Sequence, residues 1–208
     1  MPNFAIENTL EGKIAGIDEA GRGPWAGPVV AGAVCIYDKN LEAELLTHLD
    51  DSKKLTPVAR EKLYNLLFAE EQKGKLSIGI GQASVEEIDE HNILQATFMA
   101  MNRAVSSLKS PPDMAIIDGN RLPKTFPVKA QAVIGGDGKS LSIAAASIIA
   151  KVYRDHLMQE LAKRYPYYAF EKNAGYGTPA HIAGIKEHGV IKGCHRFSYR
   201  PIQEALKK

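Results

Sequence analysis

Three aspartates follow short apolar stretches of the sequence, and the first of them is followed directly by a glutamate. Asp18, with Glu19 beside it, follows KIAGI, Asp118 follows MAII, and Asp137 comes shortly after QAVI. Such apolar stretches indicate buried strands, and the ends of strands are where sites assemble in α/β sheets. A carboxylate in this position is poorly solvated unless something binds it. We therefore expect these four acids to perform the chemistry.

Four carboxylates without a nearby histidine or cysteine suit a hard ion such as Mg²⁺ or Mn²⁺ better than zinc. Neighbouring side chains on a strand point to opposite faces, so Asp18 and Glu19 converge only if the strand breaks there. The glycines at positions 21 and 23 favour such a break. Taken singly, each aspartate is equally well explained as a turn former or a helix cap, and Asp137 in IGGDGKS more so. The prediction of a metal site therefore depends on the set of four.

The acids must be positioned by strands and helices that the sequence also indicates. Strands are predicted over residues 13–18, 29–37, 76–83, 114–117 and 131–134. Helices are predicted from Thr56-Pro57 to residue 72, from Ser84 to about Leu108 with a break near His91, from about Leu141 to Arg164, and over 179–187 and 202–206. This order favours an α/β fold with a mixed five-stranded sheet flanked by helices. We place a catalytic core at residues 1–165 and a helical C-terminal extension at 166–208, packed together as one compact unit.

Length and composition are those of an ordinary globular protein. The chain has 208 residues, 45% of them hydrophobic and 24% charged, which is sufficient for one buried core. The N-terminal MPNFAIENTL lacks the pattern of a signal peptide, and the nearly apolar run 25–36 is too short to span a bilayer. Cys35 and Cys194 are too few for a disulfide framework, which fits a reducing cytoplasm. We expect a cytoplasmic protein with no membrane partner, monomeric by default.

Charge is distributed unevenly along the chain, although the formal net charge is only +2. Residues 151–208 contain 11 Lys and Arg against 5 Asp and Glu, whereas residues 1–150 contain 15 against 19. The acidic part could hold cations while the basic part attracts phosphate groups. Chance patchiness on a solvated surface explains the same counts and, on charge alone, is the simpler interpretation.

Several blocks of the sequence, taken in order, resemble the signatures of the ribonuclease HII family. IDEAGRGPWAGPVVAGAV (17–34) resembles the opening signature, in which an Asp-Glu pair precedes a Gly-Arg-Gly turn. The later blocks are DSKKLTP (51–57), IDGN (117–120), GDGKSLSIAAASIIAKVYRD (136–155), GYGTPAH (175–181) and HRFSYRP (195–201). Together they span most of the chain, and DEAGRGP and AASIIAKVYRD are the most specific. Trp25 and Phe197 depart from the expected residues, which leaves details of substrate contact open.

The resemblance implies a ribonuclease H-like fold and an endonuclease that cuts RNA joined to DNA. Such an enzyme hydrolyses the RNA strand of RNA–DNA hybrids and cuts on the 5′ side of single ribonucleotides embedded in duplex DNA, as ribonucleotide removal and primer removal require. It also implies that Asp18, Glu19, Asp118 and Asp137 are the catalytic, metal-binding acids. Two Mg²⁺ or Mn²⁺ ions would clamp the attacking water and the leaving oxygen, which gives 5′-phosphate and 3′-hydroxyl ends.

The resemblance further implies which residues contact the substrate. Gly21, Arg22 and Gly23 would form a turn that senses the ribose 2′-hydroxyl through close backbone approach. Tyr176 would stack against the sugar on the DNA side of an RNA–DNA junction, although without the resemblance a core or turn tyrosine is the simpler interpretation. Four further residues could contact phosphates, unless they are ordinary surface or capping charges: Lys53, Lys151, His195 and Arg196. Ser147 is expected to pack within a helix and Asn92 to cap one.

Other functions are compatible with parts of this pattern. A ribonuclease HIII prefers extended hybrids and usually has an additional N-terminal domain, for which the 17 residues before Asp18 are too few. A catalytically silent hybrid-binding module is the alternative from another class, but all four acids are present and nothing suggests silencing. A DNA-specific nuclease or transposase would have no use for the GRG and GYGT elements. The sequence therefore favours the ribonuclease HII interpretation.

Overall fold

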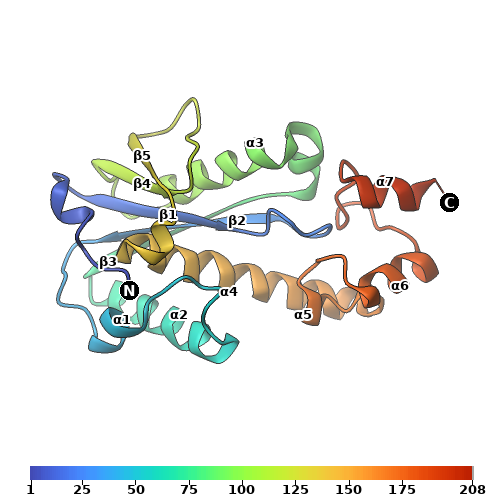
Figure 1. Cartoon of the computed structure of the whole chain (residues 1–208), viewed down its shortest axis with the longest axis horizontal. Coiled ribbons are helices and arrows are strands. Elements are labelled where there is room, and N and C mark those ends of the chain that lie inside the picture. Colours follow the sequence, from blue (N-terminus) through green and yellow to red (C-terminus); the bar gives the residue numbers. More distant parts are fainter. Residues whose placement is uncertain (208) are drawn as a thin grey trace.

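A mixed five-stranded sheet lies at the centre of the molecule (Figure 1). The computed structural model describes residues 1–207. The strands are β1 (Ile14–Ala20), β2 (Val29–Ile36), β3 (Leu76–Ala83), β4 (Met114–Asp118) and β5 (Lys129–Val133), in the order β3-β2-β1-β4-β5. The pairs β1–β2 and β2–β3 are antiparallel, whereas β1–β4 and β4–β5 are parallel. The prediction of a mixed five-stranded sheet is confirmed.

Helices cover both faces of this sheet (Figure 1). α3 (Val85–Ser106) lies on one face, and α4 (Leu141–Arg164) lies on the other with α1 (Ala43–His48) and α2 (Pro57–Gln72). Side chains alternate along β1, so that Ala15 and Ile17 pack toward α3. Gly16 faces α4, where a Cβ would come within 2.2 Å of the Ser142 carbonyl carbon. Small residues on both sides of this contact therefore let α4 lie directly against the sheet.

Side-chain caps fix where the helices begin. Thr56 accepts a backbone N–H from the first turn of α2, and Ser84 forms a capping box with Glu87 at the start of α3. Asn92, with φ at 66°, interrupts α3, and its Oδ1 accepts two N–H groups of the following turn. These caps, the break in α3 and the capping role of Asn92 all agree with the sequence predictions.

The C-terminal region is helical and gathers around the far half of α4 (Figure 1). It contains α5 (Phe170–Asn173), α6 (Pro179–His188) and α7 (Arg200–Leu206), of which the sequence predicts the last two. Buried Met158 of α4 packs there in one cluster with Tyr168, Phe170 and Ile202. The same helix therefore supports both the sheet and the C-terminal region. The division into core and extension at residue 165 stays a prediction.

The sequence did not predict the shortest elements. These are α1, α5 and the 3₁₀ helices η1 (Glu7–Thr9), η2 (Gly136–Gly138) and η3 (Pro166–Tyr168). Elements of three to six residues are too short to show a hydrophobic period. Among the helices described over residues 1–207, none has the length and apolar character needed to cross a membrane. Cys35 and Cys194 are both buried free thiols.

Candidate active site

Three of the four predicted acids lie together at one edge of the sheet. Asp18, Asp118 and Asp137 each present a carboxylate oxygen, and these three oxygens lie within 4.8 Å of one another. The parallel pairing of β1 with β4 places Ile17 opposite Ile117, so the aspartates that follow them are neighbours. Asp137 reaches them from η2, the turn that leads into α4. The fold thus brings together three residues that are separated by up to 119 positions in the chain.

Backbone hydrogen bonds hold two of these carboxylates. Asp18 Oδ1 accepts the Glu19 N–H at 2.7 Å, and Asp118 Oδ1 accepts the Gly136 N–H, also at 2.7 Å. The second bond ties the end of β4 to the loop that contains Asp137. The loop that supplies Asp137 is therefore fixed to the strand that supplies Asp118.

Ser147 contributes to this site in a way that the sequence analysis did not foresee. Its side chain is buried on the sheet-facing side of α4 and forms a hydrogen bond to Asp18 that lowers the pKa of that acid. Its Oγ also lies 2.9 Å from Ser52 Oγ, in the loop before α2. A polar residue within the buried small-residue run of α4 was the signal that could have identified it.

The clustered carboxylates repel one another in a poorly solvated place. Burial raises the pKa of Asp18 well above its usual range, and the charges of Glu19 and Asp118 raise it further. Burial and the charge of Asp118 likewise raise the pKa of Asp137. A divalent cation among these oxygens would remove the repulsion and favour the charged carboxylates. The donor set, all oxygen, thus fits a site for a hard divalent metal.

Glu19 does not join the three aspartates. β1 continues to Ala20, so the predicted strand break at this point is wrong. Strand alternation therefore directs Asp18 toward α4 and Glu19 toward α3. Burial raises the pKa of Glu19, although Arg22, with its NH1 3.3 Å from Glu19 Oε1, lowers it. Glu19 nevertheless lines a pocket of about 440 Å³ together with Asp118 and Arg22, so it borders the site from the other face of the sheet.

The GRG turn (Gly21–Gly23) and Tyr176 lie side by side although they are far apart in sequence. A Cβ at Gly23 would lie 3.2 Å from Tyr176 Cε1. Tyr176 is 52% exposed, so the alternative of a core tyrosine is wrong. Gly21 has φ at +96°, and a Cβ there would lie 2.0 Å from Arg154 Nε. Glycine is therefore required at Gly21 by the packing of the turn itself, apart from any contact with a sugar.

Arg196 supports the GRG turn from inside the protein. It is fully buried, and its guanidinium donates to the carbonyl oxygens of Gly21, Arg22, Gly27 and Pro28 and to the Tyr199 hydroxyl. The prediction that Arg196 contacts a phosphate is wrong, because its donors are already committed to the backbone. A tightly bent turn leaves carbonyl groups without strand partners, and the five N–H groups of arginine satisfy them.

Arg154 is a second buried arginine, which the sequence analysis did not single out. It donates to the carbonyl oxygens of Ala26, Pro28 and Ala174. It thereby connects α4 with the segment that follows the GRG turn and with the loop that precedes Tyr176. Its position four residues before the buried Met158, on the inner side of α4, was the available sequence signal.

The remaining predicted phosphate contacts differ from one another. His195 is fully buried, so its predicted contact is also wrong. Lys53 is exposed beside the acids. Desolvation alone would lower the pKa of Lys53, but Asp51 and the three clustered aspartates raise it. Lys151 is half-buried and forms an ion pair with Asp155 of the same helix. Of the four residues, Lys53 is the one whose surroundings place it at the acids.

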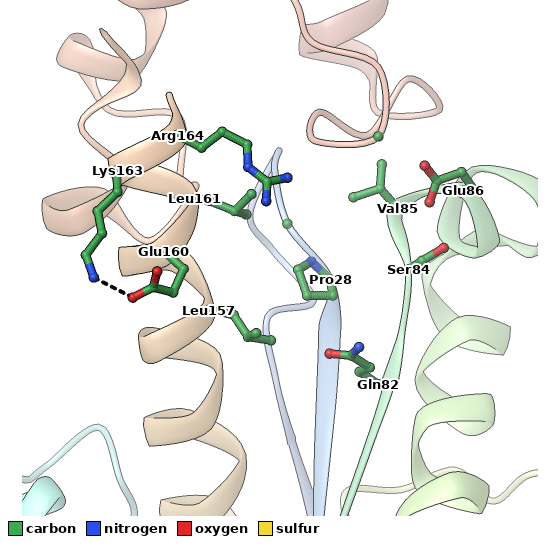
Figure 2. Close-up of a pocket in the computed structure, with 12 residues that line it drawn as sticks. Pro28, Gln82, Ser84, Val85, Glu86, Leu157, Glu160, Leu161, Lys163 and Arg164 are labelled. Atoms are coloured by element: carbon green, nitrogen blue, oxygen red, sulfur yellow. Dashed lines mark hydrogen bonds and ion pairs between the residues drawn. The ribbon is translucent and has the colours of Figure 1, made fainter. Parts of the chain in front are cut away.

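A pocket of about 630 Å³ lies away from the acids, between α4 and the starts of β2 and α3 (Figure 2). Leu157 and Leu161 of α4 face Pro28 and Val85 across it, and Lys163 pairs with Glu160 at its rim. None of the predicted site residues lines this pocket. The candidate active site is therefore at the acids, beside the smaller and more polar pocket that Glu19 and Asp118 line.

The sheet order and a carboxylate cluster that fits a divalent metal ion define the class of protein: an enzyme of ribonuclease H-like fold. Among such enzymes, the sequence model of the family described as Ribonuclease HII matches residues 15–202 of this chain. The chain belongs to the ribonuclease HII family, and it is an endoribonuclease of that family.

Individual relatives agree with this assignment. The ribonuclease HII of Rhodospirillum rubrum is 51% identical over 208 residues, which cover 100% of this chain and 93% of the relative. The solved structure of ribonuclease H2 from Pyrococcus horikoshii OT3 matches with a TM-score of 0.75 and 28% identity, and covers 94% of this chain and 97% of that one. Bst-RNase HIII, solved with Mn²⁺, matches with a TM-score of 0.75 over 94% of this chain and 69% of that one. At 17% identity, this last likeness shows the fold alone.

Proposed function

We propose that this enzyme hydrolyses the RNA strand of RNA–DNA hybrids and cuts on the 5′ side of single ribonucleotides embedded in duplex DNA. One observation supports the junction activity above all. The exposed ring of Tyr176 lies against Gly23, and Gly23 is only five residues along the chain from Asp18. A nucleotide bound against both the turn and the ring would therefore lie close to the acids.

Recognition is proposed to depend on the sugar. The backbone of Gly21, Arg22 and Gly23 would contact the 2′-hydroxyl, the group by which a protein distinguishes RNA from DNA at one nucleotide. Tyr176 would stack on the neighbouring deoxyribose, and Arg22 is exposed beside it. Lys53 would contact a phosphate, which positions the duplex without reading its sequence. Lys151 is a weaker candidate for the same role because Asp155 already neutralises it.

The four acids Asp18, Glu19, Asp118 and Asp137 would hold two Mg²⁺ or Mn²⁺ ions. When bound, such ions activate a water molecule and stabilise the leaving oxygen of an in-line displacement. Because water rather than the 2′-hydroxyl attacks, the products carry a 5′-phosphate and a 3′-hydroxyl. The protein is proposed to act as a monomer in the removal of ribonucleotides and primer-derived RNA from DNA.

The decisive experiment uses a labelled DNA duplex with one embedded ribonucleotide, incubated with the protein and Mg²⁺ or Mn²⁺. An all-DNA duplex and a long RNA–DNA hybrid serve as comparisons. We expect the protein to cut on the 5′ side of the single ribonucleotide and to hydrolyse the RNA strand of the long hybrid. The all-DNA duplex should stay intact. Cutting of the hybrid alone would indicate an activity of the ribonuclease HIII type. Binding without any cutting would leave a silent hybrid-binding module.

A further inference from the structure

Two histidines are buried together behind Tyr176. His181 belongs to α6 and His195 to the loop before α7, and neither is exposed. Their Nε2 atoms lie 3.1 Å apart. The rings of Tyr168 and Phe170 enclose them, with centroids 5.0 Å from His195 and 5.1 Å from His181, respectively. The pair is thus a polar contact inside an apolar cluster, out of reach of solvent and of any phosphate.

The neighbours of this pair allow one arrangement of its protons. The Ile191 N–H points at His195 Nδ1 at 2.9 Å, so Nδ1 must accept and the proton of His195 must be on Nε2. His195 Nε2–H then donates to His181 Nε2. His181 must therefore have its proton on Nδ1, from which it donates to the Tyr176 carbonyl oxygen at 3.0 Å. A second proton on either ring would set two N–H groups against each other.

His195 also belongs to the backbone that holds the GRG turn. His195 forms an antiparallel bridge with Ala26. In this bridge the Gly27 N–H donates to Cys194 O and the Arg196 N–H donates to Trp25 O, both at 2.8 Å. The backbone of His195 is therefore fixed to the segment that leaves the GRG turn. Its side chain, acting through His181, is fixed to the peptide group of Tyr176. One residue thus connects the two halves of the proposed recognition site.

Simple core packing does not account for this choice of residues. Two imidazoles in an apolar cluster lose their hydration, and burial lowers the pKa of His195 to about 4 and lowers that of His181. Apolar side chains would fill the same space without that cost. A completed chain of buried hydrogen bonds fixes the relative position of the two groups at its ends, because each bond requires a defined geometry. Apolar side chains pack without such directional requirements and cannot fix that position. A second link, from the Trp25 N–H to Gly175 O, holds the other side of Tyr176.

We propose that the His181–His195 pair positions Tyr176 relative to the GRG turn and thereby sets how efficiently the enzyme cuts at a single embedded ribonucleotide relative to a long hybrid. The inference rests on the substrate role proposed above for Tyr176 and the GRG turn. Both histidines are positioning residues, since neither touches substrate. A long hybrid presents no deoxyribose for Tyr176 beside the cleaved bond, so its cleavage depends less on where the ring lies.

The proton arrangement can be tested without any catalysis. Long-range ¹H–¹⁵N correlation spectra of the histidine rings at neutral pH are expected to show His181 as the Nδ1–H tautomer and His195 as the Nε2–H tautomer. A charged ring, or His181 as the Nε2–H tautomer, would overturn the proposed chain of hydrogen bonds. His188 serves as the internal reference, because it stacks on exposed Tyr167 outside the pair.

The effect on specificity is tested with His195→Phe, which keeps a ring but removes both hydrogen bonds. We expect the ratio of kcat/KM on a single-ribonucleotide duplex to kcat/KM on a long hybrid to fall about tenfold, since displacements of an ångström can cost up to about 10²-fold. Mn²⁺ affinity, measured by calorimetry, should not change, because the pair is remote from the acids. His188→Phe, the matched control, should leave the ratio unchanged.

Three outcomes would count against the inference. An unchanged ratio in His195→Phe, with the wild type cutting both substrates, would overturn the positioning role and leave the proposed function intact. Equal losses on both substrates would show that the pair is merely structural. A wild type that does not cut the single-ribonucleotide duplex would overturn the proposed junction activity and this inference with it. If His195→Phe does not fold, His181→Leu breaks the same chain at its other end and should lower the ratio equally.

Discussion

The three clustered aspartates are held where their charges are unfavourable. Asp18 is only 5% exposed, yet it lies beside two further carboxylates. Hydrogen bonds from Ser147 and from the Glu19 N–H oppose the rise in its pKa but do not cancel it. Side chains held in this way against repulsion are already arranged for the cation that relieves it. At the scale of single residues, the site is therefore specified by the set of residues that share the charge rather than by any one acid.

The substitution Asp118→Asn tests that view. The amide oxygen of the introduced side chain could still accept the Gly136 N–H, so we expect the fold and its thermal stability to be retained. Turnover should fall by at least about 10³-fold, because several kcal/mol of charge stabilisation are lost. Cleavage of the single-ribonucleotide duplex with Mg²⁺ or Mn²⁺ measures the effect. Asp113→Asn, at the opposite end of β4, is the control and should stay active. Near-normal rates in Asp118→Asn would exclude Asp118 as a metal ligand.

Tyr176 belongs to the same scale, because its proposed role depends on one exposed ring. Tyr176→Ala should reduce cleavage at a single embedded ribonucleotide about tenfold more than cleavage of a long hybrid, since stacking on an aromatic ring contributes about 1–3 kcal/mol. Tyr176→Phe keeps the ring and should behave like the wild type. Steady-state kinetics on both substrates provide the comparison. Equal losses on the two substrates would show that the tyrosine is structural.

At the scale of elements, the GRG turn is shaped by two arginines from distant segments. Arg196 comes from the loop before α7 and Arg154 from α4, and both donate to carbonyl groups around the turn. No strand of the sheet supplies these donors, because residues 21–28 lie between β1 and β2 and belong to neither strand. The conformation of the GRG turn is consequently held by the side chains of Arg154 and Arg196, which come from distant segments, rather than by hydrogen bonds within the turn.

Arg196→Lys measures how much this support contributes. Lysine has its three donors on a single atom, so it cannot replace the separate guanidinium nitrogens that bond the Gly21 and Gly27 carbonyl oxygens in this buried place. We expect a loss of about 3 kcal/mol of folding stability and a fall in Tm of roughly 6–12 °C. Arg200→Lys, where the arginine is exposed and paired with Glu204, is the control and should change little. A stable Arg196→Lys with full junction activity would contradict the role assigned to the guanidinium.

At the scale of the whole molecule, α4 joins the catalytic and recognition parts. Its first turn follows Asp137, and Glu7 near the N-terminus accepts the Ser142 N–H there at 3.1 Å. Its middle supplies Ser147 and Arg154, and its last half packs against the C-terminal helices. One continuous helix therefore contacts both the acids and the C-terminal region.

The histidine pair makes stability depend on pH. Folding lowers the pKa of His195 from 6.5 to about 4, so the unfolded chain binds more protons between these values and acid favours unfolding. The contribution is complete above pH 6.5 and is lost as the pH falls toward 4. Relative to His195→Phe, the wild type should lose about 3 kcal/mol of stability across this window. Urea unfolding followed by the fluorescence of Trp25 measures it, and a constant difference would refute the assignment.

The stability of the wild type must be compared with that of His195→Phe because the clustered acids change stability with pH in the opposite direction to His195. Folding raises the pKa values of Asp18 and Asp137, so in the metal-free protein falling pH favours the folded state through these groups. The two proteins share these acids, and their contribution therefore cancels in the difference. Urea unfolding of the wild type alone, with and without Mn²⁺, should show that the acidic contribution shrinks when the ion is present.

The sequence by itself determined the features that depend on near neighbours. The five strands, the caps at Thr56 and Ser84 and the break at Asn92 are specified by side-chain period and by hydrogen bonds over three or four residues. The grouping of Asp18, Asp118 and Asp137 was also predictable, because each follows a buried strand or turn at the same edge of a parallel pair.

Only the tertiary structure decided what depends on contacts between distant segments. Glu19 faces away from the aspartates because β1 continues through it, and that continuation is stabilised by pairing with β2. His195 and Arg196 have the charge and polarity of phosphate ligands, yet both are buried, and Arg196 bonds Gly21, 175 positions away. Residue type states which hydrogen bonds a side chain can form. Whether the partner of that side chain is solvent, substrate or a distant carbonyl group depends on how the tertiary structure buries the side chain and which segments it places beside it.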